Sequence, residues 1–363
     1  MYKDVAAAVY KRAAVAYQDG DRPVRQLPGW SWPLMFIDLL IFIPLFIYVG
    51  YTMNNLYPVL AMIEDPAPPA YDPVSLNEDD QSVVDDSAPV ADEAARSSPQ
   101  TIQITASFRN IHRTLIGIGG WRSNFRGLAC WIALSFSTLV VYGIVSVLPI
   151  LNHFKSIAAL VSAVALVQLY AAWLHIVISA PSEKHFWQRL PAFKQTFRAC
   201  ALPTAVYFVT LEIQQSFPKF LARLMDMNVW DPKNPGVVRD PMASDVWKGI
   251  VVMVVMLLLT VFLTIPAHVV LTRVQASLLP EHDETIIPFD RSFQGTLEPA
   301  IVGGHGFVSM KDAWNTFSRA SWERLVKLYL KIFGVGIALN LAFSLIVLPQ
   351  AIFMIKASQP TQN

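Results

Sequence analysis

The chain has 363 residues, of which 54% are hydrophobic and only 15% are charged. Soluble domains carry roughly 25% charged residues, so this composition excludes an ordinary soluble protein and predicts an integral membrane protein. The net charge of +1 gives no indication of nucleic acid as a partner, and two cysteines cannot build a disulfide framework. Cys130 and Cys200 lack metal-ligand spacing, so both are expected to be small apolar residues within helices.

Residues 1–32 form a separate N-terminal segment whose apolar residues recur at helical spacing. The segment has neither the apolar core nor the cleavage site of a secretory signal. Its basic residues and many alanines suggest a transit peptide, whereas Asp4, Asp19 and Asp21 argue against one. An amphipathic helix on a membrane surface fits the same pattern, so both alternatives stay open.

Six stretches are apolar enough for helices that cross a bilayer, which takes about 20 apolar residues. They cover residues 33–57, 128–150, 156–180, 199–217, 247–271 and 332–355. The fourth stretch is the weakest because Pro203 and Glu212 interrupt it. The predicted fold is therefore an all-α integral membrane protein with six transmembrane helices in a domain over residues 33–356, followed by a tail at 357–363. An even number of spans places both termini on the same side.

The loops between these spans differ in composition. Residues 64–105 are rich in acidic residues and proline, which predicts a disordered insert. Residues 106–127 are basic and have apolar residues at helical spacing, which indicates an amphipathic helix at the membrane surface. Residues 183–198 and 309–331 show a similar pattern, and Ser309 is placed to cap a helix.

A span, a loop, an amphipathic segment and a second span follow one another three times, which predicts three pseudo-repeats of two spans and a surface helix. The clearest landmark is "PAHVVLTRVQ", with Pro266, Arg273 and Gln275. Here the chain resembles the mitochondrial carrier family, whose repeat ends each odd helix in Pro-x-Asp/Glu-x-x-Lys/Arg-x-Arg-x-Gln. His268 replaces the acid of that motif, and Leu271 replaces its first basic residue.

Further remnants of the carrier motifs are scattered over residues 30 to 356. Pro181 and Glu183 match in the second repeat, whereas only Pro58 matches in the first. The stretch "GIGGWRSNFRGL" looks like the family's Gly-rich start of an even helix, through Gly120, Phe125, Arg126 and Gly127. The resemblance implies a carrier-like membrane domain in a mitochondrial membrane, with peroxisome and endoplasmic reticulum as alternatives.

The resemblance also implies a mechanism, because carriers close one side of the pore with ion pairs between the acid and base of these motifs. Only Glu183 stands at an acidic position of this kind, and no Lys or Arg stands at the basic one. The motif chemistry of a carrier gate is therefore expected to be largely lost in this chain.

Polar residues within the spans are the candidates for a substrate site, because they are costly in a bilayer. The cavity candidates are Glu212, Gln214, Gln215 and Asn340. Asp38 is expected to face the membrane interface, and His175, Gln168 and Asn340 are expected to form hydrogen bonds between helices. The even spans contain no Lys or Arg, so an anionic substrate would find little compensation there.

Two functions from different classes fit these observations. The first is a divergent carrier-like transporter of a neutral, zwitterionic or lipid-like small molecule. The second is a non-transporting scaffold or adaptor that binds protein partners in an organelle membrane. No catalytic constellation, metal spacing or cofactor motif stands out, so the expectation is no enzyme activity, no metal and no cofactor. The lipid bilayer is the one partner that the composition itself predicts.

Overall fold

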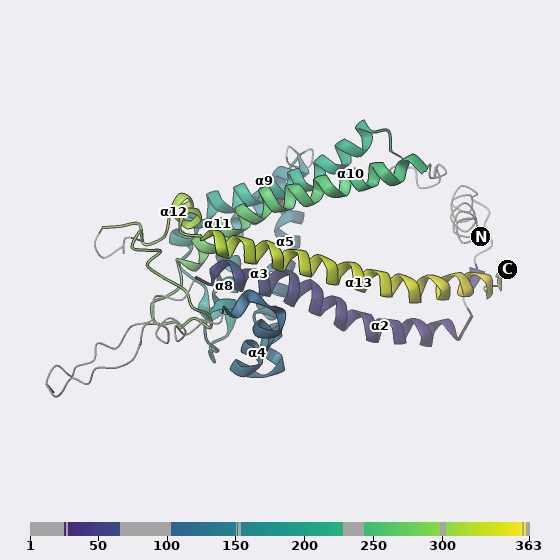
Figure 1. Ribbon diagram of the computed structural model, residues 1–363, viewed down its shortest axis with the longest axis horizontal. Helices are drawn as coiled ribbons and strands as arrows, with labels where there is room; N and C mark the ends of the chain where they lie inside the picture. The colour runs from purple at the N-terminus through teal and green to yellow at the C-terminus, as the bar shows by residue number, and fades with distance from the viewer. Residues whose placement is uncertain are drawn as a thin grey trace, which may run out of the picture.

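The computed structural model describes residues 25–26, 28–65, 103–149, 151, 154–227, 243–297, 303–357 and 359–360. These residues are almost entirely helical (Figure 1). The N-terminal segment before residue 25 and the middle of the acidic insert lie outside the described residues. The predictions for them therefore stay predictions.

The helical segments up to the middle of the chain, in order, are α2 Ser31–Ile47, η1 Tyr48–Leu56, α3 Tyr57–Ile63, η2 Ile104–Ala106, α4 Phe108–Gly119, η3 Trp121–Phe125, α5 Leu128–Ser146, α7 Lys155–Ala165 and α8 Val167–Ile178. The later ones are η4 Phe186–Arg189, α9 Phe193–Leu224, α10 Ala243–Leu259, η5 Thr260–Thr264, α11 Ile265–Ala276, α12 Met310–Asn315 and α13 Arg319–Ala357. Strand β1 (Arg25–Gln26) pairs antiparallel with β2 (Gln359–Pro360). This pairing brings the two ends of the described chain together.

Four helices within the described ranges are long and apolar enough to cross a membrane. They are Ser31–Ile63, Trp121–Ser146, Val246–Ala276 and Arg319–Ala357. A fifth candidate is the pair α7 and α8, which is bent by 56°. Helix α9 covers the predicted span at 199–217, but it is not among the candidates. The predicted all-helical fold is thus confirmed, and it has four or five candidate membrane spans instead of the predicted six.

Two of the three landmark prolines lie at matching places in long helices. Pro58 is the second residue of α3 and follows the π-helix η1, while Pro266 is the second residue of α11 and follows the π-helix η5. Proline cannot donate the helical hydrogen bond to the preceding turn, and a π-helical segment absorbs this interruption without ending the helix. Pro181 differs, because it lies beyond the end of α8 and is exposed, and the bend in that region comes at Leu166.

The core of the molecule lies at one end of the bundle, which is called the closed end below. It consists of α3, the second half of α8, α11, the first turns of α13 and the loop 277–297. Helices α3, α8 and α11 contact one another pairwise there, on the left of Figure 1. Toward the opposite end, α2, α10 and most of α13 expose apolar side chains, and only 6 to 17% of their most apolar windows is buried. Such surfaces fit a lipid environment.

The predicted surface helices are correct in one case out of three. Helix α4 lies within 106–127, and the Ser107 hydroxyl caps it by accepting a hydrogen bond from the Asn110 amide. The prediction for 183–198 is wrong, because this stretch holds only the short η4 before α9 begins at Phe193. The stretch 309–331 is divided between α12, which Ser309 caps, and the beginning of α13.

The acidic insert needs a correction at both of its ends. Glu64 is 1% exposed and Thr105 is equally buried, although the prediction of disorder covered both residues. The Glu64 carboxylate accepts hydrogen bonds from the backbone amides of Ile104 and Thr105, at 2.6 and 3.0 Å. The insert therefore leaves from and returns to one point of the closed end. Both cysteines are free and buried, as predicted.

Candidate functional site

The closed end is held together by buried arginines. Arg273 of α11 is 1% exposed, and its Nη1 forms an ion pair with Asp65 at 3.0 Å. The same guanidinium donates hydrogen bonds to the Met62 carbonyl and the Thr316 hydroxyl, at 3.3 and 3.2 Å. Its plane lies over the rings of Phe293 and Phe317. One side chain thus connects α11, the end of α3, the loop after α11 and the approach to α13.

A second buried arginine ties α13 to α3. Nη1 of Arg324 lies 3.4 Å from Oε2 of Glu64, and its Nη2 donates to the Glu64 carbonyl at 2.9 Å. Both side chains are almost completely buried. A buried charge without a partner is very costly, so these two pairs hold the ends of α3, α11 and α13 together. We refer to the Arg273–Asp65 and Arg324–Glu64 pairs as the lock.

Helix α8 joins the closed end through hydrogen bonds. Nε2 of His175 lies 2.9 Å from the Gln275 carbonyl of α11, which confirms the predicted role of His175 between helices. The loop after α11 also crosses the end of α8, where the Ala180 amide donates to the Glu284 carbonyl and the Ile286 amide donates to the Ile178 carbonyl.

The pKa values of two carboxyl groups in this region are shifted. Burial raises the pKa of Asp65, and the opposing effects of Arg273 and of the Asp290 amide do not offset it. Burial would also raise the pKa of Asp290, but hydrogen bonds from the Ser292 hydroxyl and from the Gln294 and Ser292 amides lower it. Ionisation of Asp65 in the folded protein therefore costs free energy, because the carboxyl group is buried at the closed end.

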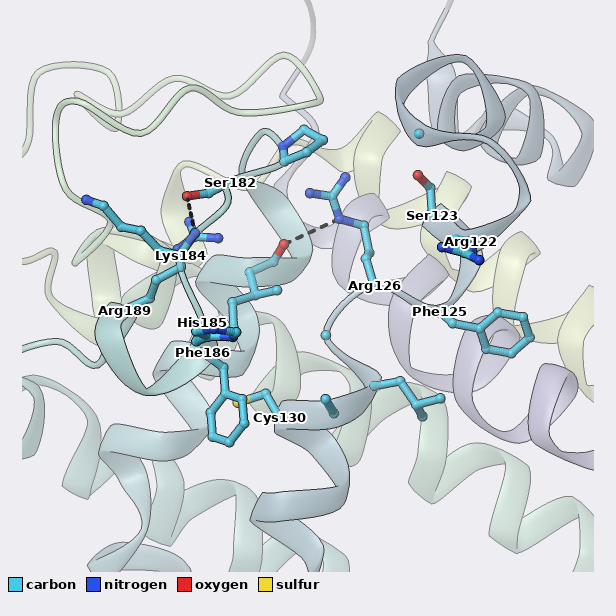
Figure 2. Close-up of a pocket in the computed structure, with 16 residues that line it drawn as sticks. Arg122, Ser123, Phe125, Arg126, Cys130, Ser182, Lys184, His185, Phe186 and Arg189 are labelled. Carbon is cyan, nitrogen blue, oxygen red and sulfur yellow. Dashed lines mark hydrogen bonds between the residues drawn. The ribbon is translucent and has the colours of Figure 1, made fainter.

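A basic pocket of about 460 Å³ opens beside the lock, between the start of α5 and the segment after α8 (Figure 2). Its lining contains four cationic side chains and no carboxylate. The cations are Arg122, Arg126, Lys184 and Arg189. Phe186, Cys130 and Leu128 supply apolar wall.

Arg126 is a buried cation of this pocket that has no ion pair within the described ranges. Its Nε donates to the Ile176 carbonyl at 3.3 Å, and its Nη2 donates to the Ser179 carbonyl. Nη1 is buried and has no hydrogen-bond partner in the described part of the chain. Arg189 on the opposite wall is paired, since it lies 3.0 Å from Asp283. The unpaired Nη1 of Arg126 is therefore a donor that suits an anionic group in the pocket.

Gly127 fixes how the chain enters α5 at this pocket. Its φ of +77° lies in the left-handed region, where side chains with a Cβ are disfavoured. A Cβ at this position would lie 3.1 to 3.2 Å from Tyr51, Trp173 and Val177. The preceding carbonyl, of Arg126, accepts a 2.5 Å hydrogen bond from the Tyr51 hydroxyl. Glycine thus lets the start of α5 pack closely against η1 and α8.

The predicted cavity candidates do not come together in one place. The Glu212 carboxylate accepts a hydrogen bond from Ser156 of α7, and the Gln214 amide bonds to Thr260 and Thr264 in η5. Gln215 is exposed, and Asn340 bonds only to the Gly336 carbonyl of its own helix, so Asn340 does not join two helices. Glu212 and Gln214 therefore serve as contacts of α9 with neighbouring helices, whereas Gln215 and Asn340 are exposed.

Other polar residues of the predicted spans do connect segments. Gln168 donates to the Pro191 carbonyl at 2.7 Å. Asp38 accepts from Gln350 at 3.5 Å, which links α2 to α13. Among the motif remnants, Glu183 is exposed, whereas Arg273 and Gln275 are buried.

The lock is not predicted from the sequence, because three of its four charges lie outside the motif positions of the odd helices. Glu64 and Asp65 fall within the predicted insert, and Arg324 falls within a predicted surface helix. The signal that could have found them is the pair of acidic residues directly after the apolar run that ends at Ile63. Charges at a span end that face a bundle need partners.

No protein-family model matches the chain, and no curated protein or solved structure is significantly similar to it. The resemblance to mitochondrial carriers therefore rests on the motif residues alone.

Proposed function

We propose that this multi-span helical protein is a membrane transporter, of carrier-like type, for a neutral, zwitterionic or lipid-like molecule. The observation that carries the proposal is the lock. Two buried ion pairs join three helix ends at one end of the bundle, while the same helices expose apolar surface toward the other end.

The energetics of such pairs suit a gate. A buried ion pair contributes little net stability relative to apolar packing, but it is strongly destabilising when one partner is removed. When water reaches both partners at once, each is solvated and the cost of separation falls. A bundle end that is closed by ion pairs can therefore open in one step when water enters. A bundle end that is closed by apolar packing opens less readily.

The arrangement of elements also supports a carrier-like organisation. Two of the three odd helices carry a proline directly after a π-helical segment, and α3, α8 and α11 contact one another at the closed end. The gate positions of the carrier motif are not the ones used. His268 and Leu271 carry no ion pair, and the charge comes from Arg273 and from two residues beyond the end of α3.

Opening of the closed end can be tested without knowing the substrate. Thr272 is 1% exposed and lies beside Arg273 in α11. In a chain with Cys130 and Cys200 replaced by alanine, a Thr272→Cys thiol in proteoliposomes should react with a cationic, membrane-impermeant methanethiosulfonate. The reaction should be faster than global unfolding. Glu64→Gln should accelerate it by about tenfold, since the ion pair between Glu64 and Arg324 is then weakened.

The matched control is Glu323→Gln, which weakens the exposed ion pair of Glu323 with Arg319. This substitution should leave the labelling rate unchanged. Labelling that never exceeds the rate of global unfolding, with or without Glu64→Gln, would show a permanently closed end and would contradict transport.

A scaffold that binds protein partners is the second candidate, and the anchoring of the acidic insert favours it. Glu64 and Thr105 hold both ends of the insert at one point, so a partner bound to the insert would be fixed relative to the bundle. A chain without residues 68–100 should then lose a co-purifying partner that the full chain retains. Equal recovery from both chains would remove this candidate.

A further inference from the structure

Four ring side chains from four helices meet in the interior of the bundle. They are Tyr170 of α8, Tyr207 of α9, His268 of α11 and Tyr329 of α13, called the aromatic layer below. The Tyr170 hydroxyl lies 3.3 Å from Nε2 of His268, and the Tyr329 hydroxyl lies 3.4 Å from Nδ1. The ring of Tyr207 stacks on the imidazole at 4.8 Å between centroids. The imidazole thus has both nitrogens and one face in contact with tyrosines.

The aromatic layer lies directly inside the closed end. On three helices its residue is five positions from a buried polar residue of the closed end. These pairs are Tyr170 with His175, His268 with Arg273, and Tyr329 with Arg324. Five helical residues span about 7.5 Å. Helix α13 runs antiparallel to α8 and α11, so on all three helices the ring lies about this far from the closed end, toward the middle of the bundle. The aromatic layer therefore lies next to the lock, on its inner side.

Exposure differs between this level and the next one. All four residues of the aromatic layer are of intermediate exposure. Arg273 and His175, five residues further toward the closed end, are 1% and 2% exposed. The aromatic layer is therefore less tightly covered than the polar level of the closed end.

The polar chemistry of the aromatic layer is uncharged. Among the described residues, no Lys, Arg, Asp or Glu side chain hydrogen-bonds to any of the four rings, and the charges of the lock are already paired. The Tyr207 hydroxyl has no hydrogen-bond partner within the described ranges, and His268 is the one ring there that stacks on Tyr207. An unpaired hydroxyl on such a ring can bind a planar group that carries a hydrogen-bonding atom.

We propose that the aromatic layer is the binding site for the transported molecule and that this molecule presents a planar, uncharged group with a hydrogen-bond acceptor or donor. The site rests on the proposed transport function. A charged group at this level would have no counter-charge, which makes its desolvation unfavourable. The level of the site above the lock places a bound molecule where it can influence opening of the closed end.

Three small probes of the same skeleton test the site: benzamide is neutral, benzoate is anionic and benzylamine is cationic at pH 7. In detergent, benzamide at millimolar concentration should raise the Tm of the full chain by about 2–4 °C, because it binds the folded state. Benzoate and benzylamine should have no effect. Tyr207→Phe keeps the ring and removes only the free hydroxyl, so it should reduce the benzamide shift by at least half. His268→Leu should abolish it.

Tyr142→Phe is the matched control, since Tyr142 of α5 lies outside the aromatic layer, and it should keep the full benzamide shift. The proposal is overturned if benzamide produces no shift, if either charged probe stabilises as much, or if the shift survives in both Tyr207→Phe and His268→Leu. Binding is measured here with the closed end shut, whereas labelling of the Thr272→Cys thiol measures its opening. A benzamide shift without that labelling would sink the transport function and leave the site standing.

Discussion

The closed end and the opposite half of the bundle are built from the same helices but hold together by different means. At the closed end, charged side chains are buried and paired over large separations in sequence, 208 residues for Arg273 and Asp65. In the opposite half, α2 and α13 meet mainly through aromatic contacts such as Phe42 with Phe343, whose rings lie 5.0 Å apart.

This difference shows where the specificity of the fold lies. Apolar side chains that face lipid gain little from helix association, because lipid tails are as apolar as they are. Paired charges and backbone hydrogen bonds at the closed end therefore fix which helix ends meet. Substitutions at the closed end should destabilise the molecule strongly, and matched substitutions elsewhere should not.

The largest effect is expected from Arg273→Met. The substitution leaves Asp65 buried without its partner and removes the hydrogen bond to Thr316. Loss of one partner of a buried pair costs about 3–5 kcal/mol, and the free energy of unfolding in detergent should fall by that amount.

Arg319→Met is the control for that experiment, since Arg319 is 90% exposed in its pair with Glu323. Exposed pairs contribute about 0–1 kcal/mol, so this variant should unfold like the parent chain. A similar loss of stability in both variants would show that the buried ion pair contributes no more to the free energy of unfolding than the exposed one.

Gly127→Ala should have the second largest effect. It combines a left-handed φ with contacts of 3.1 to 3.2 Å from the new Cβ to three neighbours, and together these should cost about 2–3 kcal/mol. Gly143→Ala, in a helix with no close neighbour, should be neutral or slightly stabilising. Chemical unfolding should show the loss in Gly127→Ala and not in Gly143→Ala, and equal stability of the two variants would contradict the close packing at Gly127.

A smaller effect is expected at the helix cap beside the closed end. The Ser309 hydroxyl accepts a hydrogen bond from the Asp312 amide at 3.1 Å and donates one to its carboxylate at 2.6 Å. Ser309→Ala should lower the free energy of unfolding by about 1 kcal/mol. Ser135→Ala, which removes a hydroxyl that bonds only within α5, should change it by less, and the difference between the two variants measures the cap.

Much of the helical architecture could be predicted from the sequence, because apolar length is a local property of the chain. The cap at Ser309 and the buried cysteines followed from local chemistry in the same way. The bend at Leu166 could not be predicted, since no proline or glycine marks it, and the division of 309–331 into two helices has no such marker either.

The candidate sites were harder to predict, because they depend on contacts between distant segments. His268 was noted only as a replacement for an acid, and Tyr170, Tyr207 and Tyr329 read as ordinary residues of apolar helices. Their meeting depends on the relative rotation of four helices, which local spacing does not determine. Arg126 is a predicted motif remnant, but its unpaired Nη1 depends on which distant segments line the pocket around it.

The smallest expected effect is the pH dependence of stability at the closed end. It tests whether burial or the ion pair with Arg273 determines the pKa of Asp65. Because burial raises the pKa of Asp65, the folded chain keeps this proton to a higher pH than the unfolded chain does. The resulting contribution to stability is fully present below the ordinary carboxyl pKa. It is lost as the pH rises from that value through the raised pKa of the folded state.

Asp65→Asn removes the titrating group and keeps the size of the side chain. The difference in Tm between the parent chain and this variant, measured in detergent from pH 4 to 7, cancels the titration of the other carboxyl groups that both share. This difference should move against the parent chain as the pH rises through the window. A difference that moves toward the parent chain would mean that Arg273 outweighs burial and lowers the pKa of Asp65, which makes the lock a net source of stability at neutral pH and a less suitable gate.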